Sequence, residues 1–251
     1  FHESRPDYLP SGTMPNAVAR TINSLKLKMS ATGPARLLAA YGGITYLVYL
    51  ETSGFSRMSP LLSALPMISL SVFTLLTSMQ PHAKIFTTGA FISSALAIYL
   101  QSSAWAPVSF AALFVIGRNL LYFLSFQHLI REWSFPIALM TGLYLSFFTV
   151  VCFADLLFSI PTLVCCLFIG VASACFLVLA SGSLAQGGSL DDTSNSQASI
   201  IRFVGAMMET ACVSMFIYSA FARRTETTLF MYRICEYVAH GLLFLANERE
   251  F

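Results

Sequence analysis

The stretch that decides the fold is "RFVGAMMETACVSMFIYSAF", residues 202–221. It is apolar almost throughout, and about 20 apolar residues in a helix cross the hydrocarbon core of a bilayer. The segment therefore predicts a transmembrane helix with one carboxylate, Glu209, near its middle. Whether Glu209 does chemistry in the membrane or holds helices together depends on the rest of the chain.

The whole chain has the composition of a membrane protein. Hydrophobic residues make up 56% of the 251 residues and charged residues 10%, against about 25% charged in soluble domains. A soluble protein of this length could not bury so much apolar surface. The apolar runs are continuous rather than alternating, which favours helices over a barrel. We expect an all-α polytopic bundle, and the net charge of +2 predicts no nucleic-acid partner.

Eight transmembrane helices account for the apolar runs. They are expected near residues 36–53, 60–79, 85–101, 108–130, 135–154, 159–181, 199–221 and 228–247. The Gly/Ser-rich segment 182–198 predicts a flexible loop. The chain thus divides into a leader, residues 1–35, and a bundle, residues 36–251.

The leader is polar at first and then basic and amphipathic. Apolar residues recur at helical spacing at Val18, Ile22, Leu25 and Met29, with basic residues mainly off that stripe. This pattern predicts a short helix in the membrane interface; a frayed polar tail is the alternative.

Basic residues indicate the orientation. With eight helices both termini share one side, which holds Arg5, Arg20, Lys26, Lys28, Arg36, Lys84, Arg131, Arg202 and Arg249, against Arg57, Arg223 and Arg224 opposite. The termini are then expected in the cytosol or the mitochondrial matrix. The first residue is Phe1, so a presequence was removed or the chain was trimmed. The mitochondrial inner membrane and the endoplasmic reticulum both stay open.

Several ionisable residues fall within the predicted spans. A charge at mid-bilayer costs about 2.5–3.5 kcal/mol, so these side chains should point inward and be paired. Arg233 and Glu236 are three residues apart on one helix, with His240 four residues further on, so all three share a face. Glu209 and Arg118 lie mid-span on different helices and could meet across the bundle. Structural pairing and a site lining a cavity are both open.

Familiar catalytic and metal motifs are missing from the sequence. There is no G-x-S-x-G, H-E-x-x-H, P-loop or GxGxxG opening a helix. The four histidines are scattered and the six cysteines lie in apolar runs without C-x-x-C spacing, so we expect no metal and no cofactor.

From about residue 60 to its end the chain resembles the lysoplasmalogenase-like (YhhN) family of eight-span membrane proteins. The resemblance is carried by "LPMISLSVF", "AKIFTTGAFISSALAIYLQ", "ALFVIGRNLLYFLSF", "VGAMMETACVSMFIYSAF" and "EYVAHGLLFL", in this order. It implies an intramembrane pocket and cleavage of the vinyl-ether bond of lysoplasmalogens. That reaction needs an acid and a base, which two carboxylates in different environments could supply.

The chain departs from the family where the resemblance places its two aspartates. These positions are occupied by Leu96 and Val213, and the family's fourth-span histidine falls on Asn119. Neither Leu nor Val transfers protons, so the resemblance implies a degenerate member without catalytic residues. Glu209 lies one turn before Val213 and could replace one acid, with Glu236 as the plausible partner. A structural contact and a ligand contact without chemistry are the other interpretations of Glu209.

We therefore expect a non-catalytic membrane protein that is an accessory or structural subunit of a larger membrane complex or a lipid-holding module. The alternative is a hydrolase of lysoplasmalogen-type lipids with a rearranged carboxylate site. A transporter is less favoured, because no broken helix pair or inverted repeat is visible. Expected partners are membrane lipids and other membrane-protein subunits. Candidate polar or lipid-pocket residues are Arg118, Asn119, Tyr122, Glu209, Arg233, Glu236 and His240.

Overall fold

The described part of the chain forms an all-helical bundle, which confirms the all-α part of the predicted fold class. The computed structural model describes residues 33–55, 59–103, 106–154, 160–187, 193–221 and 226–251, with no strand in these ranges. The helices are α2 (Pro34–Glu51), α3 (Pro60–Leu76), α4 (Pro81–Ser102), α5 (Val108–Phe126), α6 (Phe135–Phe153), α7 (Pro161–Gly187), α8 (Thr193–Phe221) and α9 (Glu226–Glu250), with a 3-10 turn at Gln127–Leu129. The expected interfacial helix falls within residues 1–32, outside the described residues.

Proline sets the start of five of these helices. Pro34, Pro60, Pro81, Pro136 and Pro161 each stand in a first turn. Proline suits this place because the N–H groups of the first turn have no partner within the helix. The local sequence therefore explains why the helices begin close to the ends of the apolar runs.

The flexible loop expected over residues 182–198 is much shorter in the structure. Helix α7 continues to Gly187 and α8 already begins at Thr193. Gly and Ser weaken a helix but do not forbid one, and tertiary packing overrides propensity. Here Ser181, Ser183 and Leu184 are buried against the rest of the bundle, so this end of α7 is held by packing.

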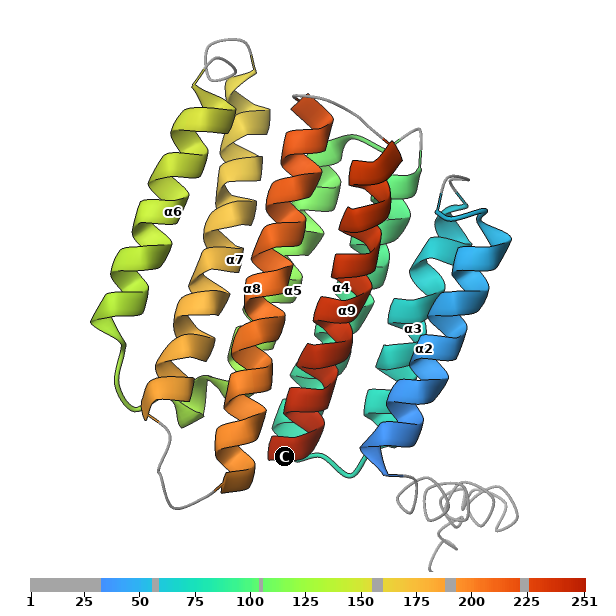
Figure 1. Cartoon of the computed structure of the whole chain (residues 1–251), viewed down its shortest axis with the longest axis vertical. Helices are drawn as coiled ribbons and strands as arrows, with labels where there is room; N and C mark the ends of the chain where they lie inside the picture. Colours follow the sequence, from blue (N-terminus) through green and yellow to red (C-terminus); the bar gives the residue numbers. More distant parts are fainter. Residues whose placement is uncertain (1–32, 56–58, 104–105, 155–159, 188–192, 222–225) are drawn as a thin grey trace, which may run out of the picture.

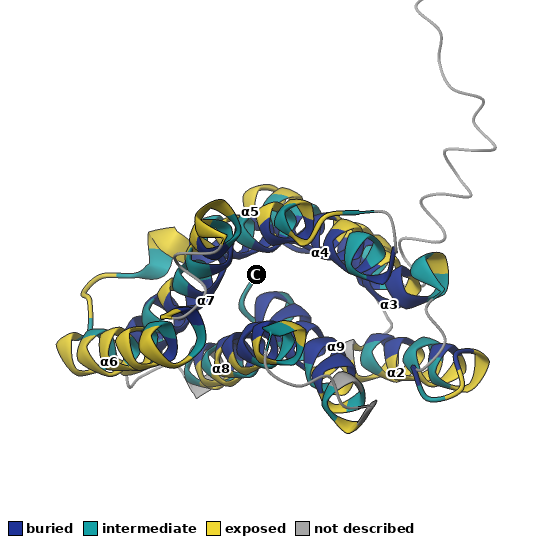
Figure 2. Ribbon diagram, turned by 90° about the horizontal axis from the view of Figure 1, so that it is seen from above, coloured by how far each residue is buried: buried dark blue, intermediate teal, exposed yellow. Residues whose placement is uncertain are grey.

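The helices are packed in two layers. Figure 1 shows them running side by side, and Figure 2 shows α7, α5, α4 and α3 along one layer and α6, α8, α9 and α2 along the other. Contacts between α8 and α9 and between α4 and α5 are the most extensive. Helix α2 begins and α9 ends at the same end of the bundle (Figure 1), as an even number of antiparallel helices requires.

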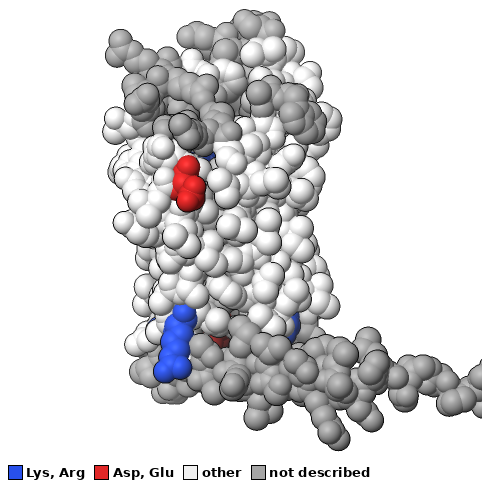
Figure 3. Space-filling view, turned by 90° about the vertical axis from the view of Figure 1, so that its right-hand side faces the viewer, with Lys and Arg blue, Asp and Glu red and all other residues white. Residues whose placement is uncertain are grey.

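The outer surface of the bundle is apolar over a broad band. Five helices, α4 to α8, contain segments long and apolar enough to cross a membrane. Figure 3 shows one face with a broad uncharged zone between an acidic patch toward one end and a basic patch near the other. A band of this kind faces lipid in a membrane protein. These features define an integral membrane protein.

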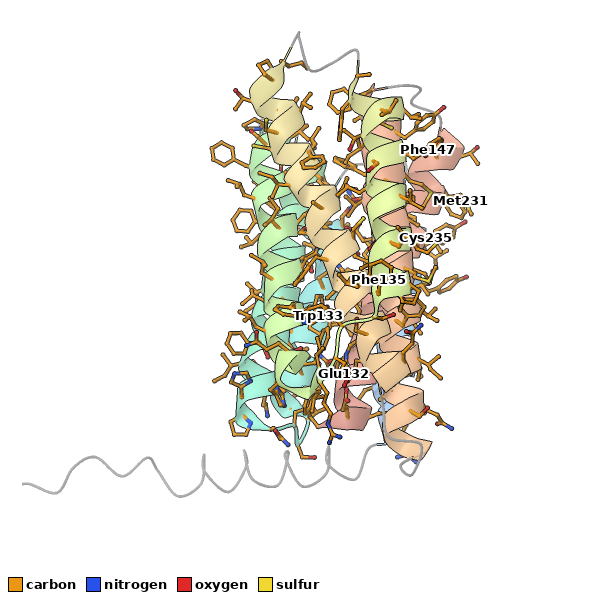
Figure 4. All side chains as sticks on the ribbon, turned by 90° about the vertical axis from the view of Figure 1, so that its left-hand side faces the viewer. Glu132, Trp133, Phe135, Phe147, Met231 and Cys235 are labelled. Carbon is orange, nitrogen blue, oxygen red and sulfur yellow. The ribbon has the colours of Figure 1, made fainter. Side chains whose placement is uncertain are left out.

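Helix α6 lies at the edge of the bundle. Most of its side chains are exposed, including Phe135 at 78% and Phe147 at 68%, and both point outward in Figure 4. Only Phe148 and Phe153 of α6 are buried. The helix packs chiefly on α7, with a smaller contact to α8.

Candidate functional site

A cluster of five ionisable side chains lies between the two layers, at the middle of the bundle. We call Arg118, Glu209, Arg233, Glu236 and His240 the central cluster; none is more than 6% exposed. They come from α5, α8 and α9, and the sequence had singled out all five. The two arginines and two glutamates balance in charge, which is how buried charges are tolerated at this depth.

Arg118 joins α5 to both α8 and α9. Its Nη2 donates a hydrogen bond to Oε1 of Glu209, and its Nη1 lies 3.3 Å from Oε1 of Glu236. The same Nη1 lies 3.2 Å from Nε2 of His240. The contact between Arg118 and Glu209 across the bundle was expected because both residues lie in the middle of predicted membrane spans, and the structure contains it.

The contact with Arg118 settles the proton position on His240. A guanidinium N–H can only donate, so Nε2 must accept and the proton of the neutral ring sits on Nδ1. That Nδ1 lies 3.8 Å from Oε2 of Glu209. Neither Nδ1 of His240 nor Oε2 of Glu209 has a hydrogen-bond partner among the described residues.

Arg233 closes the cluster toward the beginning of α9. Its Nη1 donates to Oε2 of Glu236 at 3.0 Å, the predicted contact between residues three apart. Its Nη2 donates to the Ser102 hydroxyl at 2.9 Å, which ties α9 to the end of α4. Glu236 thus receives one arginine on each oxygen.

Asn119 and Tyr122 line the interior next to the cluster. Asn119 donates to the Ser173 hydroxyl at 3.0 Å and so links α5 to α7. The Tyr122 ring packs against Phe91 and His240, with ring centroids 5.5 and 6.0 Å apart. Its hydroxyl is buried without a hydrogen-bond partner in the described part of the chain.

A second polar group lies nearer the end of the bundle where the described chain begins and ends; we call Arg202, Asn247 and Glu250 the end cluster. Asn247 accepts from Arg202 Nη2 at 2.8 Å, and Arg202 also pairs with Glu250. The Asn247 amide donates to hydroxyls of Thr87 and Ser125, so one side chain on α9 joins α4, α5 and α8.

Sequence reasoning missed the end cluster. Arg202 was grouped with the basic residues of the membrane surface, but it is fully buried, and its guanidinium carbon lies 4.6 Å from the centre of the Phe126 ring. It is buried because α8 begins nine residues before it. One signal could have found the cluster: Asn247 follows Glu236 by three helical turns and therefore shares its face of α9.

The two positions of the implied aspartates do not face a common pocket. Val213 is buried among side chains of α5, α7 and α8. Leu96 is 41% exposed on the outer surface of α4, while Ala95 beside it is buried. A carboxylate in place of Leu96 would face the surroundings of the bundle.

The cavities differ in size and place. The one bounded by Arg118 and Val213 has a volume of only about 20 Å³. Two larger apolar grooves lie within the layer of α6, α8, α9 and α2. The groove between α2 and α9 holds about 520 Å³, and the groove between α6 and α8 holds about 590 Å³.

The fold and its buried ion pairs define an all-helical integral membrane protein. No protein family, curated protein or solved structure matches the chain. All six cysteines are free thiols, and the described residues contain no group of three or more potential metal ligands.

Proposed function

We propose that this chain is a non-catalytic membrane protein of eight transmembrane helices that holds lipid chains in grooves on its outer surface. The observation that carries the proposal is the contrast between its cavities. The interior beside Arg118 offers about 20 Å³, whereas two outer grooves offer about 520 and 590 Å³. Ligand pockets are commonly 300–1,000 Å³, so only the grooves reach that size.

The central cluster supports a structural rather than a catalytic role for its charged groups. Both oxygens of Glu236 are occupied by arginines, and Oε1 of Glu209 is bonded to Arg118. A general acid or base must instead reach its substrate. The cavity lined by Arg118, at about 20 Å³, is too small to hold a lysophospholipid.

The grooves have the chemistry that an acyl chain requires. The groove between α2 and α9 is walled by aromatic rings, including Tyr41, Tyr49, Phe55 and Phe230, and Gly42 also lines it. Aromatic and aliphatic walls bind methylene chains through dispersion contacts over a large area. A bilayer supplies such chains at high concentration, so a weak affinity suffices for occupancy.

A matched pair of substitutions on α2 tests lipid holding. Gly42 lines the groove and Gly43 does not, and an added Cβ meets no atom within 4 Å at either residue. Native mass spectrometry of protein released from membranes should show fewer retained lipids for Gly42→Leu than for the wild type or Gly43→Leu. Equal retention in all three proteins would refute the groove as a lipid site.

One observation favours a hydrolase as the second candidate. Glu209 Oε2, His240 Nδ1 and the Tyr122 hydroxyl are buried near one another without hydrogen-bond partners in the described ranges. A carboxylate beside an imidazole is an arrangement that activates water. Purified protein incubated with lysoplasmenyl lipid should release no aldehyde; turnover abolished by Glu209→Gln would favour the hydrolase.

The resemblance to the lysoplasmalogenase-like family and the orientation belong to the same proposal. Eight crossings would place both termini on the same side of the membrane. By the distribution of basic residues, that side is the cytosol if the membrane is the endoplasmic reticulum, or the matrix if it is the mitochondrial inner membrane. Labelling of single cysteines at positions 36 and 249 should find both on one side. The exposed apolar surface of α6 is open either to lipid or to another membrane protein, and an accessory role in a larger membrane complex would use the second kind of contact. Co-purification at fixed stoichiometry would establish that role.

A further inference from the structure

The small cavity beside Arg118 is lined by polar groups that take no part in the ion pairs, as well as by Arg118 itself. Arg118, Gln101 and Tyr232 line it, together with apolar side chains of α5, α7 and α8. The Tyr232 hydroxyl donates to Gln101, so these two groups are held in place on the same wall. The cavity lies apart from the outer grooves and does not depend on what they bind.

One nitrogen of Arg118, Nε, is buried and has no hydrogen-bond partner among the described residues. Nη1 and Nη2 of the same side chain serve Glu236, His240 and Glu209. A guanidinium cannot lose its charge to escape this cost. In the membrane core an unused N–H is expensive, so an acceptor is expected beside it.

We propose that this cavity is a binding site for one water molecule, held by Arg118 Nε and by the Tyr232–Gln101 pair. The volume of about 20 Å³ accommodates one water, which needs about 10–15 Å³ and two to four polar partners. A neutral ligand fits because the surrounding charges already balance: two arginines face two glutamates. An anion would add charge to a neutral cluster at mid-membrane.

Gly170 is the position at which a substitution can test this site. It lines the cavity and is buried, and a Cβ added there meets no atom within 4 Å. Gly170→Ala would therefore place a methyl group where the water binds. Gly142 on α6 is the control at an exposed helical position: its Cβ would meet nothing within 4 Å, and its carbonyl accepts a serine hydroxyl as that of Gly170 does.

The two variants are compared by thermal unfolding of the full chain in detergent at one scan rate. Gly142→Ala should raise the midpoint by up to roughly 2–4 °C, because Ala favours helix. Gly170→Ala should lower it by a similar amount, because the water is lost and Nε is left unbonded. A rise in both variants would show a dry void and overturn the proposal.

A map of the wild-type protein that resolves ordered waters provides a second test, which also decides the matter if Gly170→Ala does not fold. A water peak within about 3.5 Å of Arg118 Nε is the expected result. A cavity without such a peak would overturn the proposal.

Discussion

Helices α6 and α9 contrast in composition and in position. Helix α6 is apolar over nearly its whole length, yet only 6% of its membrane segment is buried. Helix α9 carries Arg233, Glu236, His240 and Asn247, and all four are almost fully buried. In a membrane the apolar helix can stand in lipid, while the polar helix must be surrounded by partners. Apolar composition alone therefore does not place a helix in this bundle, because α7 is more hydrophobic than α6 and yet half of its membrane segment is buried.

The largest effect should come from breaking the contact between α5 and α8 at the centre. Arg118→Ala and Glu209→Ala should each lower the free energy of unfolding by roughly 3–5 kcal/mol, because each leaves a buried charge without its partner. The double variant should lose less than the sum of the two. Denaturant titration in detergent measures this, with the exposed Arg36→Ala as control. Strict additivity would mean that the two side chains are not coupled.

A smaller effect is expected where α6 and α8 approach α7. A Cβ on Gly182 would lie 2.5 Å from Ile137 Cδ1 and 2.8 Å from a Phe203 ring carbon. Gly182→Ala should therefore destabilise the protein by about 1–3 kcal/mol through overpacking. Gly187→Ala on the same helix is the control, since a Cβ there meets nothing within 4 Å. Equal midpoints of thermal unfolding for the two variants would show that Ile137 and Phe203 move aside without a measurable cost.

The hydrogen bond between Tyr144 of α6 and Ser214 of α8 should matter less. Tyr144 and Ser214 hydroxyls lie 2.6 Å apart, and Ser214 also bonds its own helix. Tyr144→Phe should cost about 0.6 kcal/mol, the average for such contacts between transmembrane helices. Tyr218→Phe, at a half-exposed position, provides the comparison. A loss above about 2 kcal/mol would show that α6 depends on this bond for its position.

The smallest effect is expected on the outer face of α6. Phe147 is 68% exposed, whereas its neighbour Phe148 is 8% exposed and packs on Phe153. Phe147→Leu should change the free energy of unfolding by less than about 0.5 kcal/mol, and Phe148→Leu should cost more. If Phe147→Leu proved the costlier change, the outer face of α6 would have to be covered by protein.

Much of the fold follows from local sequence. Apolar runs and first-turn prolines place the eight helices to within a few residues at most ends. The buried pairs at Arg118, Glu209, Arg233 and Glu236 could also be predicted, because charges at that depth need partners. Arg202 could not, since a basic residue near the end of an apolar run is equally suited to the membrane surface.

By itself, then, the sequence determined a helical membrane protein, the places where its helices begin, and the need for internal charge pairing. These depend on hydrophobicity, on proline geometry and on the cost of charge in lipid, all of which act residue by residue. The tertiary structure alone decided that α9 is central and α6 peripheral, that Leu96 faces outward, and that Asn247 joins four helices. Lipid tails are as apolar as a protein core, so hydropathy does not say which apolar face meets protein. That choice depends on side-chain shape and hydrogen bonds between helices far apart in the chain.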